Sequence, residues 1–184
     1  MGRVVAIANQ KGGVGKTTTA INLGAALAAF DRKVVLVDFD PQANATSGLG
    51  RSGQANGATA YDVLLGADPH LALQDSGFPN LSLLPSGRDL VGAEIELVNQ
   101  EGRENRLRTA LDAIRNEFDY VLVDCPPSLS LLTVNALTAA DSVLIPLRPS
   151  SAKYSVWSGI RTESAAVSAL TVRSESDGGQ STNT

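Results

Sequence analysis

A glycine-rich segment directly after a short apolar run constrains the fold of this chain more than any other feature. Residues 3–9 are mostly apolar, as in a buried parallel strand, and residues 9–19 read NQKGGVGKTTT. The usual phosphate-binding pattern, G-x-x-x-x-G-K-[ST], would place a glycine where this chain has Gln10, and an additional lysine, Lys11, follows. A glycine-rich turn that merely caps a helix is the alternative interpretation. The strand-like run before the segment and the helical run after it favour a phosphate-binding loop.

Strand-like and helix-like segments alternate along the first 147 residues. Apolar runs at residues 33–38, 119–124 and 142–147, with a weaker run at 81–84, predict further strands. Helical spacing of apolar residues predicts helices at 16–30, 89–98, 103–118 and 131–140. This alternation is typical of a parallel sheet with right-handed crossovers. We therefore expect an α/β fold of the P-loop NTPase type, with a mainly parallel sheet flanked by helices in three layers, α/β/α.

Size and composition favour one domain followed by a tail. The chain has 184 residues, of which 43% are hydrophobic and only 4% aromatic, which indicates a core of Val, Leu, Ile and Ala. Residues 1–170 are expected to form the domain, with a last amphipathic helix over residues 154–170. The polar residues 171–184 are expected to be a disordered tail.

The net charge and the single cysteine limit the cellular compartment and the class of binding partner that we expect. The net charge of −4 argues against a strongly basic chain, although it leaves room for a local basic patch. The single cysteine, Cys125, excludes an internal disulfide and fits a reducing cytosol. The sequence contains no long apolar stretch, so we expect neither a signal peptide nor a membrane span. A cytoplasmic protein is therefore expected.

The glycine-rich segment contains the groups that a phosphate site requires. Gly12, Gly13 and Gly15 allow consecutive backbone N–H groups to point inward at the start of a helix, which makes a nest for anions. In such a loop Lys16 would reach the β- and γ-phosphates, and the Thr17 hydroxyl would bind Mg²⁺. The segment therefore predicts a nucleotide site with a magnesium ion.

Carboxylates follow two of the predicted strands. Asp38 and Asp40 stand two residues apart on extended chain, so both side chains would face the same side, towards the phosphates. Alternatively, an Asp/Pro cluster simply ends a strand. Asp124 ends the apolar run DYVLVD, where P-loop proteins place the carboxylate that supports Mg²⁺. Ligands of α/β sheets bind beyond the carboxyl ends of the strands, where all three residues are expected.

Three segments together resemble the ParA/MinD family of deviant Walker ATPases. They are KGGVGKT at residues 11–17, DFDPQANATSGLG at 38–50 and DCPPS at 124–128. Within that family the chain is most similar to the Soj-type chromosome-partitioning ParA proteins, because DLVGAEIEL at 89–97 and LTVNALTAAD at 132–141 also match that subgroup. The resemblance extends over residues 3–147.

The resemblance implies roles for individual residues. Lys11 would be the signature lysine, which reaches across a nucleotide-sandwich dimer to the phosphates held by the other subunit. Asp40 would position or activate the attacking water, and Asp38 would support the geometry of Lys16 and Mg²⁺. Residues 12–18 would bind the nucleotide, with Val14 inside the loop and the Thr18 hydroxyl at the α-phosphate.

The resemblance also implies a function. The chain would be an ATP-binding, Mg²⁺-dependent ATPase that forms an ATP-dependent homodimer, binds DNA non-specifically and acts with a ParB-type partner in chromosome or plasmid partitioning. It would be cytoplasmic, or nucleoid-associated if it retains DNA binding, and would not bind a membrane. The family continues through further βα units after the strand matching residues 142–147, so we expect a sheet that lacks those C-terminal strands and has an uncovered edge. The alternative is a truncated, non-catalytic nucleotide-binding or interaction module without DNA binding.

Overall fold

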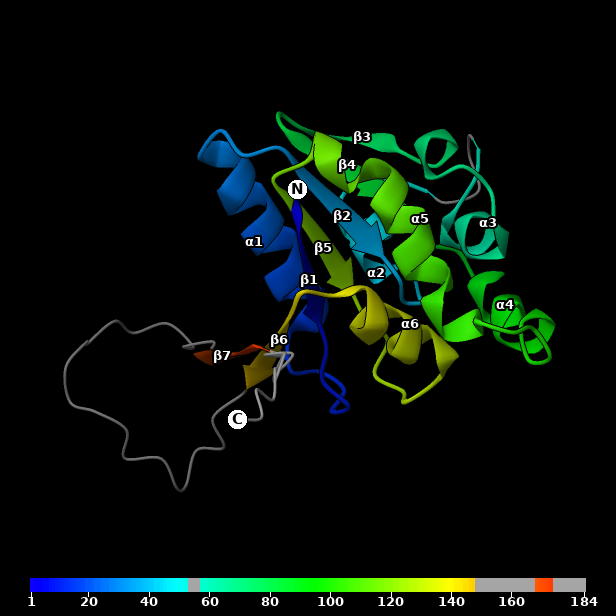
Figure 1. Cartoon of the computed structure of the whole chain (residues 1–184). Coiled ribbons are helices and arrows are strands. Elements are labelled where there is room, and N and C mark those ends of the chain that lie inside the picture. The colour runs from blue at the N-terminus through cyan, green and yellow to red at the C-terminus, as the bar shows by residue number, and fades with distance from the viewer. Residues whose placement is uncertain (53–56, 148–167, 174–184) are drawn as a thin grey trace, which may run out of the picture.

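The computed structural model describes residues 1–52, 57–147 and 168–173, and within them strands and helices alternate (Figure 1). The strands are β1 (Arg3–Ile7), β2 (Val34–Asp38), β3 (Gln74–Phe78), β4 (Leu81–Leu84), β5 (Tyr120–Asp124), β6 (Ser142–Leu147) and β7 (Ser168–Arg173). The α-helices are α1 (Lys16–Ala29), α2 (Asn44–Gly48), α3 (Ala60–Leu65), α4 (Leu90–Glu96), α5 (Arg106–Ile114) and α6 (Leu131–Ala139). Short 3₁₀ turns lie at η1 (Pro69–Leu71), η2 (Arg103–Asn105) and η3 (Arg115–Glu117).

The strands form one mainly parallel sheet in the order β3-β4-β2-β5-β1-β6-β7. The five central strands, β4, β2, β5, β1 and β6, are parallel to one another, whereas β3 and β7 pair antiparallel at the two edges. The predicted α/β class and parallel sheet are therefore confirmed. β3 was not expected, because its sequence, QDSGF, carries no apolar alternation.

The C-terminal part of the sheet differs from the prediction. β7 pairs with β6 over its full length, so the expectation of an uncovered edge at residues 142–147 is wrong. The prediction of a helix over residues 154–170 is also wrong at its C-terminal end, since residues 168–170 belong to β7. Residues 154–167 lie outside the described residues, as does the part of the expected 171–184 tail beyond residue 173, whereas residues 171–173 belong to β7. The domain boundary at residue 170 stays a prediction.

Helices cover both faces of the sheet and give three layers (Figure 1). Alternate residues of β2 divide between two cores. Val35 and Val37 pack with α3, α4, α5 and α6, whereas Val34 and Leu36 pack with α1 and α2. Because successive side chains of a strand point to opposite faces, an almost unbroken apolar strand is required at the centre of such a sheet. The predicted α/β/α arrangement is confirmed.

The register of the central strands brings their carboxyl ends to one edge. Ile7 at the end of β1 lies opposite Asp124 at the end of β5, and Asp38 at the end of β2 also lies opposite Asp124. The loop that follows β1 therefore emerges beside two aspartates from neighbouring strands.

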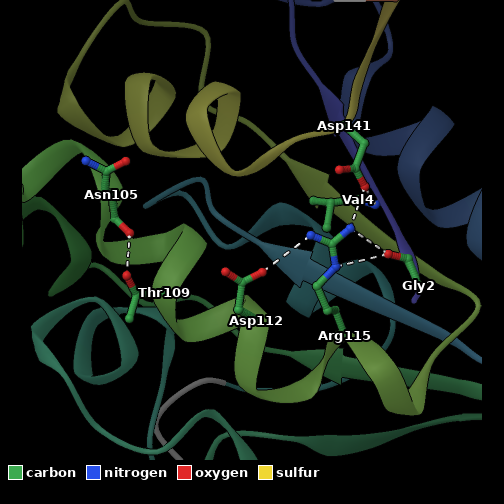
Figure 2. Close-up of polar contacts among 7 residues, drawn as sticks. All are labelled: Gly2, Val4, Asn105, Thr109, Asp112, Arg115 and Asp141. Carbon is green, nitrogen blue, oxygen red and sulfur yellow. Dashed lines mark hydrogen bonds and ion pairs between the residues drawn. The ribbon is translucent and has the colours of Figure 1, made fainter. Parts of the chain in front are cut away.

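A polar cluster around Arg115 fixes the opposite, amino-terminal edge (Figure 2). The Arg115 guanidinium donates to the Gly2 carbonyl through Nε (3.2 Å) and Nη2 (2.9 Å), and Nη2 also pairs with Asp141 Oδ2 at 2.7 Å. The same Asp141 oxygen accepts the Val4 N–H at 2.8 Å. The end of the α5–η3 segment is thus tied to the starts of β1 and β6, at the edge of the sheet away from the glycine-rich loop.

Candidate nucleotide-binding site

The glycine-rich loop joins β1 to α1 in the conformation that an anion nest needs. Gly13 and Gly15 have φ values of 70° and 89°, in the left-handed region that favours glycine. A Cβ atom built on Gly12, Gly13 or Gly15 would meet no other atom within 4 Å, so the space next to the loop is open. Gly15 caps α1 without any side-chain hydrogen bond, and the first turn of the helix contains no acidic residue. The helix N-terminus therefore keeps its N–H groups and its positive dipole available for an anion.

Lys16 and Thr17 open α1 and lie next to Asp124. Lys16 is buried and Thr17 is half-buried, as expected for side chains that line a site rather than a surface. Both influence Asp124, since the Thr17 hydroxyl and the Lys16 charge each lower its pKa. The predicted phosphate lysine and the predicted hydroxyl ligand are thus brought to the end of β5.

Asp124 is a buried carboxylate without a hydrogen-bond partner. Its side chain is fully buried, and burial, reinforced by the charges of Asp38 and Asp40, raises its pKa to about 7. The neighbouring Thr17 hydroxyl lowers this pKa, yet both carboxylate oxygens lack a regular hydrogen-bond partner among the described residues. A buried charged group is normally paired or bound to a metal. A Mg²⁺ ion shared by Asp124 and the Thr17 hydroxyl fits this arrangement.

Asp38, in contrast, is fully engaged by protein donors. Its Oδ2 accepts the Thr46 N–H and the Thr46 hydroxyl, both at 2.7 Å, and its Oδ1 accepts the Asp40 N–H at 3.3 Å. Burial raises the pKa of Asp38, and the hydrogen bonds from Thr46 lower it. Thr46 Oγ1 in turn accepts the Ser86 N–H at 3.1 Å. Asp38 therefore anchors α2 and the loop after β4 to the end of β2.

Asp40 is buried in a tight turn between β2 and α2. Its Oδ1 accepts the Gln42 N–H at 3.0 Å, and its carbonyl accepts the Ala43 N–H at 2.8 Å. Ala43 has a φ of 52°, which a non-glycine residue rarely adopts. The charge of Asp40 raises the pKa of both Asp38 and Asp124, so three carboxylates share one electrostatic environment.

The remaining predicted residues lie on or beside the loop. Lys11 and Thr18 are exposed and do not join the carboxylates, while Val14 is buried and packs the loop onto the fold. The backbone of Lys11 is held by a residue that the sequence reasoning missed. Asn9 Oδ1 accepts the Lys11 N–H at 2.9 Å, and Asn9 Nδ2 donates to the Pro146 carbonyl in β6 at 2.8 Å. In the sequence, the only sign of this role is the position of the Asn9 amide between an apolar run and the glycine-rich loop.

The described residues limit which ligands a metal ion at this site could have. Nowhere in these residues do three or more His, Cys, Asp or Glu side chains gather as a metal site. A cation at Asp124 would therefore need the Thr17 hydroxyl, water and phosphate oxygens as ligands, a set that suits Mg²⁺.

Within the described residues, no helix combines the length and the apolar character needed to cross a bilayer.

The fold and the loop together place the chain in the P-loop NTPase class. A family model for the AAA domain (AAA_31) matches residues 2–172. Over 149 residues the chain is 56% identical to the chromosome partitioning protein ParA of Myxococcus xanthus and 53% identical to the sporulation initiation inhibitor protein Soj of Bacillus subtilis. These matches cover 80% of this chain but only 53% and 59% of the two relatives, so the chain spans little more than half of their length.

Solved structures agree with this assignment. A protein from Mycobacterium smegmatis named cobyrinic acid a,c-diamide synthase, with bound ATP analogue and magnesium, superposes with a TM-score of 0.77 at 46% identity, over 85% of this chain and 64% of that one. A plasmid partition protein from Borrelia burgdorferi gives a TM-score of 0.73 at 31% identity, over 82% and 68%. The chain belongs to the ParA/MinD family, and its similarity is to the Soj-type members.

Proposed function

We propose that this chain binds ATP with Mg²⁺ and hydrolyses it as the switch of a DNA-partitioning system. The observation that carries the proposal is Asp124, a buried carboxylate without a hydrogen-bond partner beside the Lys16–Thr17 helix start. Two relatives, at 56% and 53% identity, carry a chromosome-partitioning name and a sporulation name, which supports partitioning over the amide-synthase name of one structural neighbour.

The loop and α1 supply the phosphate contacts. The N–H groups of residues 12–18 would surround the phosphates, and the Lys16 ammonium would neutralise charge between the β- and γ-phosphates. Thr17 and Asp124 would hold Mg²⁺, which when bound supplies positive charge to the phosphate oxygens. The Thr18 hydroxyl, exposed at the start of the helix, would contact the α-phosphate.

The carboxylates after β2 would position water and shape the site. Asp40 lies in the turn after β2, close enough to Asp124 for its charge to raise that residue's pKa, and would orient the attacking water. Asp38 has both oxygens committed to Thr46 and Asp40, so it would act by positioning. Because Thr46 belongs to α2, a change at Asp38 would also affect the placement of α2.

Lys11 gives the site its dependence on a second subunit. Its side chain is exposed while its backbone is fixed by Asn9, as suits a group that acts on a neighbouring molecule. In the whole protein, Lys11 would reach the phosphates across an ATP-dependent homodimer. That dimer would bind non-specific DNA and respond to a ParB-type protein in the cytoplasm or on the nucleoid. The alternative is a non-catalytic module that binds nucleotide but neither dimerises nor binds DNA.

Nucleotide binding is tested with a fluorescent ATP analogue. Lys16→Ala removes a charge-assisted contact and should weaken Mg²⁺-dependent binding by at least about a hundredfold, from about 3 kcal/mol per contact with a charged group. Lys33→Ala is the matched control, because Lys33 is exposed at the opposite edge of the sheet. Equal affinity of the two variants would disprove the assignment of the loop.

Turnover is tested separately from binding. Asp40→Ala should retain the nucleotide but lose hydrolysis, because it removes a water-positioning group rather than a phosphate contact. The assay is phosphate release, with this chain and with one extended by the C-terminal region of a relative. Hydrolysis by Asp40→Ala at the parent's rate would refute that role. Nucleotide binding without turnover in either parent chain would favour the non-catalytic module.

The intersubunit role is tested by analytical ultracentrifugation with a non-hydrolysable ATP analogue. The extended chain should dimerise with nucleotide, and Lys11→Ala should weaken that dimer while sparing nucleotide binding by the monomer. An unchanged dimer in the Lys11 variant would show that the residue does not act across the interface.

A further inference from the structure

A second polar pocket lies beside the candidate nucleotide site. It has a volume of about 320 Å³ and opens between the turn after β2, helix α2 and the loop after β4. Its lining includes Thr46, Ser47, Arg51, Ser86, Gly87 and Arg88. No residue of the glycine-rich loop lines it, so it is separate from the phosphate nest.

Ser86 marks this pocket as a place for a ligand. The residue is fully buried, yet its hydroxyl has no hydrogen-bond partner among the described residues. Leaving a buried hydroxyl unpaired destabilises a fold, so such a group normally has a partner, which is an ordered water or a ligand where the protein supplies none. The Ser86 backbone N–H is already used by Thr46, which leaves the hydroxyl as the free group.

The charge of the lining selects an anion. Arg51 and Arg88 are both exposed, and neither forms an ion pair with any residue in the described ranges. No aspartate or glutamate lines the pocket, although the Asp89 carboxylate lies close to Gly87, which does line it. Guanidinium groups present planar sets of donors that match oxyanions, and a hydroxyl adds one further donor.

We propose that this pocket binds a phosphate group, held by Arg51 and Arg88 and by the Ser86 hydroxyl. The group is either free inorganic phosphate or the phosphate of a small phosphomonoester, because both present the same tetrahedral oxyanion. A pocket of about 320 Å³ is large enough for either.

Occupancy of the pocket is transmitted to the candidate nucleotide site through Thr46. The Thr46 hydroxyl accepts the Ser86 N–H and donates to Asp38 Oδ2, so one side chain joins the two sites. A phosphate that draws the Ser86 hydroxyl towards itself shifts the backbone donor of the same residue. The positions of Asp38 and α2 therefore depend on whether the pocket contains a ligand.

The test is residue-resolved NMR of the ¹⁵N-labelled chain, titrated with inorganic phosphate and, in a second arm, with O-phosphoserine. Sodium chloride at equal ionic strength corrects for screening. We expect saturable shifts of the Ser86, Gly87 and Thr46 amides. The arm with the tighter binding identifies the source of the phosphate. Shifts confined to the amides of the glycine-rich loop, or equal shifts with chloride, would overturn the proposal.

Two variants assign the binding to the proposed groups. Arg88→Gln and Ser86→Ala should each weaken the shifts at the pocket by about tenfold or more, as expected for loss of a donor to a charged ligand. The shifts at the glycine-rich loop should stay unchanged, which separates this result from any failure of the proposed ATPase function. Ser86→Ala should not lower the melting temperature, because it removes an unpaired hydroxyl. Pocket affinity equal to the parent's in both variants would refute the assignment.

Discussion

Replacing Asp124 by asparagine should make the metal-free chain more stable at high pH. The pKa of Asp124 is raised from 3.8 to about 7, chiefly by burial, so the folded chain holds this proton more tightly than the unfolded chain. Its contribution to stability is therefore present below about pH 4 and is lost as the pH rises through 7. With about 1.4 kcal/mol for each pKa unit, the full penalty above pH 7 is at most about 4 kcal/mol. Relaxation and water entry reduce it, and we expect roughly 2 kcal/mol.

The measurement is urea unfolding in EDTA without nucleotide, at pH 5 and pH 8. At pH 5 the advantage of Asp124→Asn over the parent should be less than half of that at pH 8, because most of the penalty develops between pH 5 and pH 7. At pH 8 the variant should be the more stable. Asp141→Asn is the control, since it loses its pairing with Arg115 and should destabilise the chain at pH 8. A variant that is less stable than the parent at pH 8, or a gap that does not change with pH, would refute the reasoning.

The same substitution should have the opposite effect when Mg²⁺ and ATP are present. A ligand at a hundred times its dissociation constant stabilises the folded state by about 2.7 kcal/mol. If Asp124 holds Mg²⁺, the parent gains this stabilisation and the variant does not. The order of stability should then reverse on adding Mg²⁺ and ATP at pH 8.

Three further predictions concern the opposite edge of the sheet and the single histidine. Gly2→Ala should lower the urea midpoint clearly, because an added Cβ would overlap the carbonyl oxygen of Arg115; an unchanged midpoint would contradict the packing. Arg115→Lys should cost about 1–2 kcal/mol, and a double-mutant cycle with Asp141→Asn should show coupling, since lysine cannot reproduce the forked contacts. Glu117 raises the pKa of His70, so in an NMR titration Glu117→Gln should lower that pKa; an equal pKa in both chains would remove Glu117 as the cause.

The parts of the fold that the sequence predicted are those encoded by local patterns. The apolar runs at 33–38 and 119–124 became β2 and β5, because an almost unbroken apolar run suits a strand buried on both faces. β3 and β7 escaped prediction because edge strands are defined by their neighbour rather than by their own periodicity.

In the candidate site, too, the residues set by local sequence patterns were predicted, whereas those that meet only in the folded chain were not. Lys16, Thr17, Asp38, Asp40 and Asp124 could be predicted as candidates, since each stands at or just after the end of a strand or at the start of a helix. Thr46 and Ser86 were not, because they lie 40 residues apart and meet only through tertiary structure. The Ser86 N–H donates to the same Thr46 oxygen whose proton bonds Asp38, and no spacing rule encodes this contact.

The bond from Asn9 to the Pro146 carbonyl makes the loop and β6 one cooperative unit. Local opening of β6 breaks that bond and releases the amide side chain that holds the Lys11 N–H. Hydrogen exchange of the Lys11 amide should therefore follow the slow opening of a β-strand rather than the rapid fluctuation of an exposed loop. A loop with little packing of its own thus takes its rigidity from a strand more than 130 residues away in the sequence.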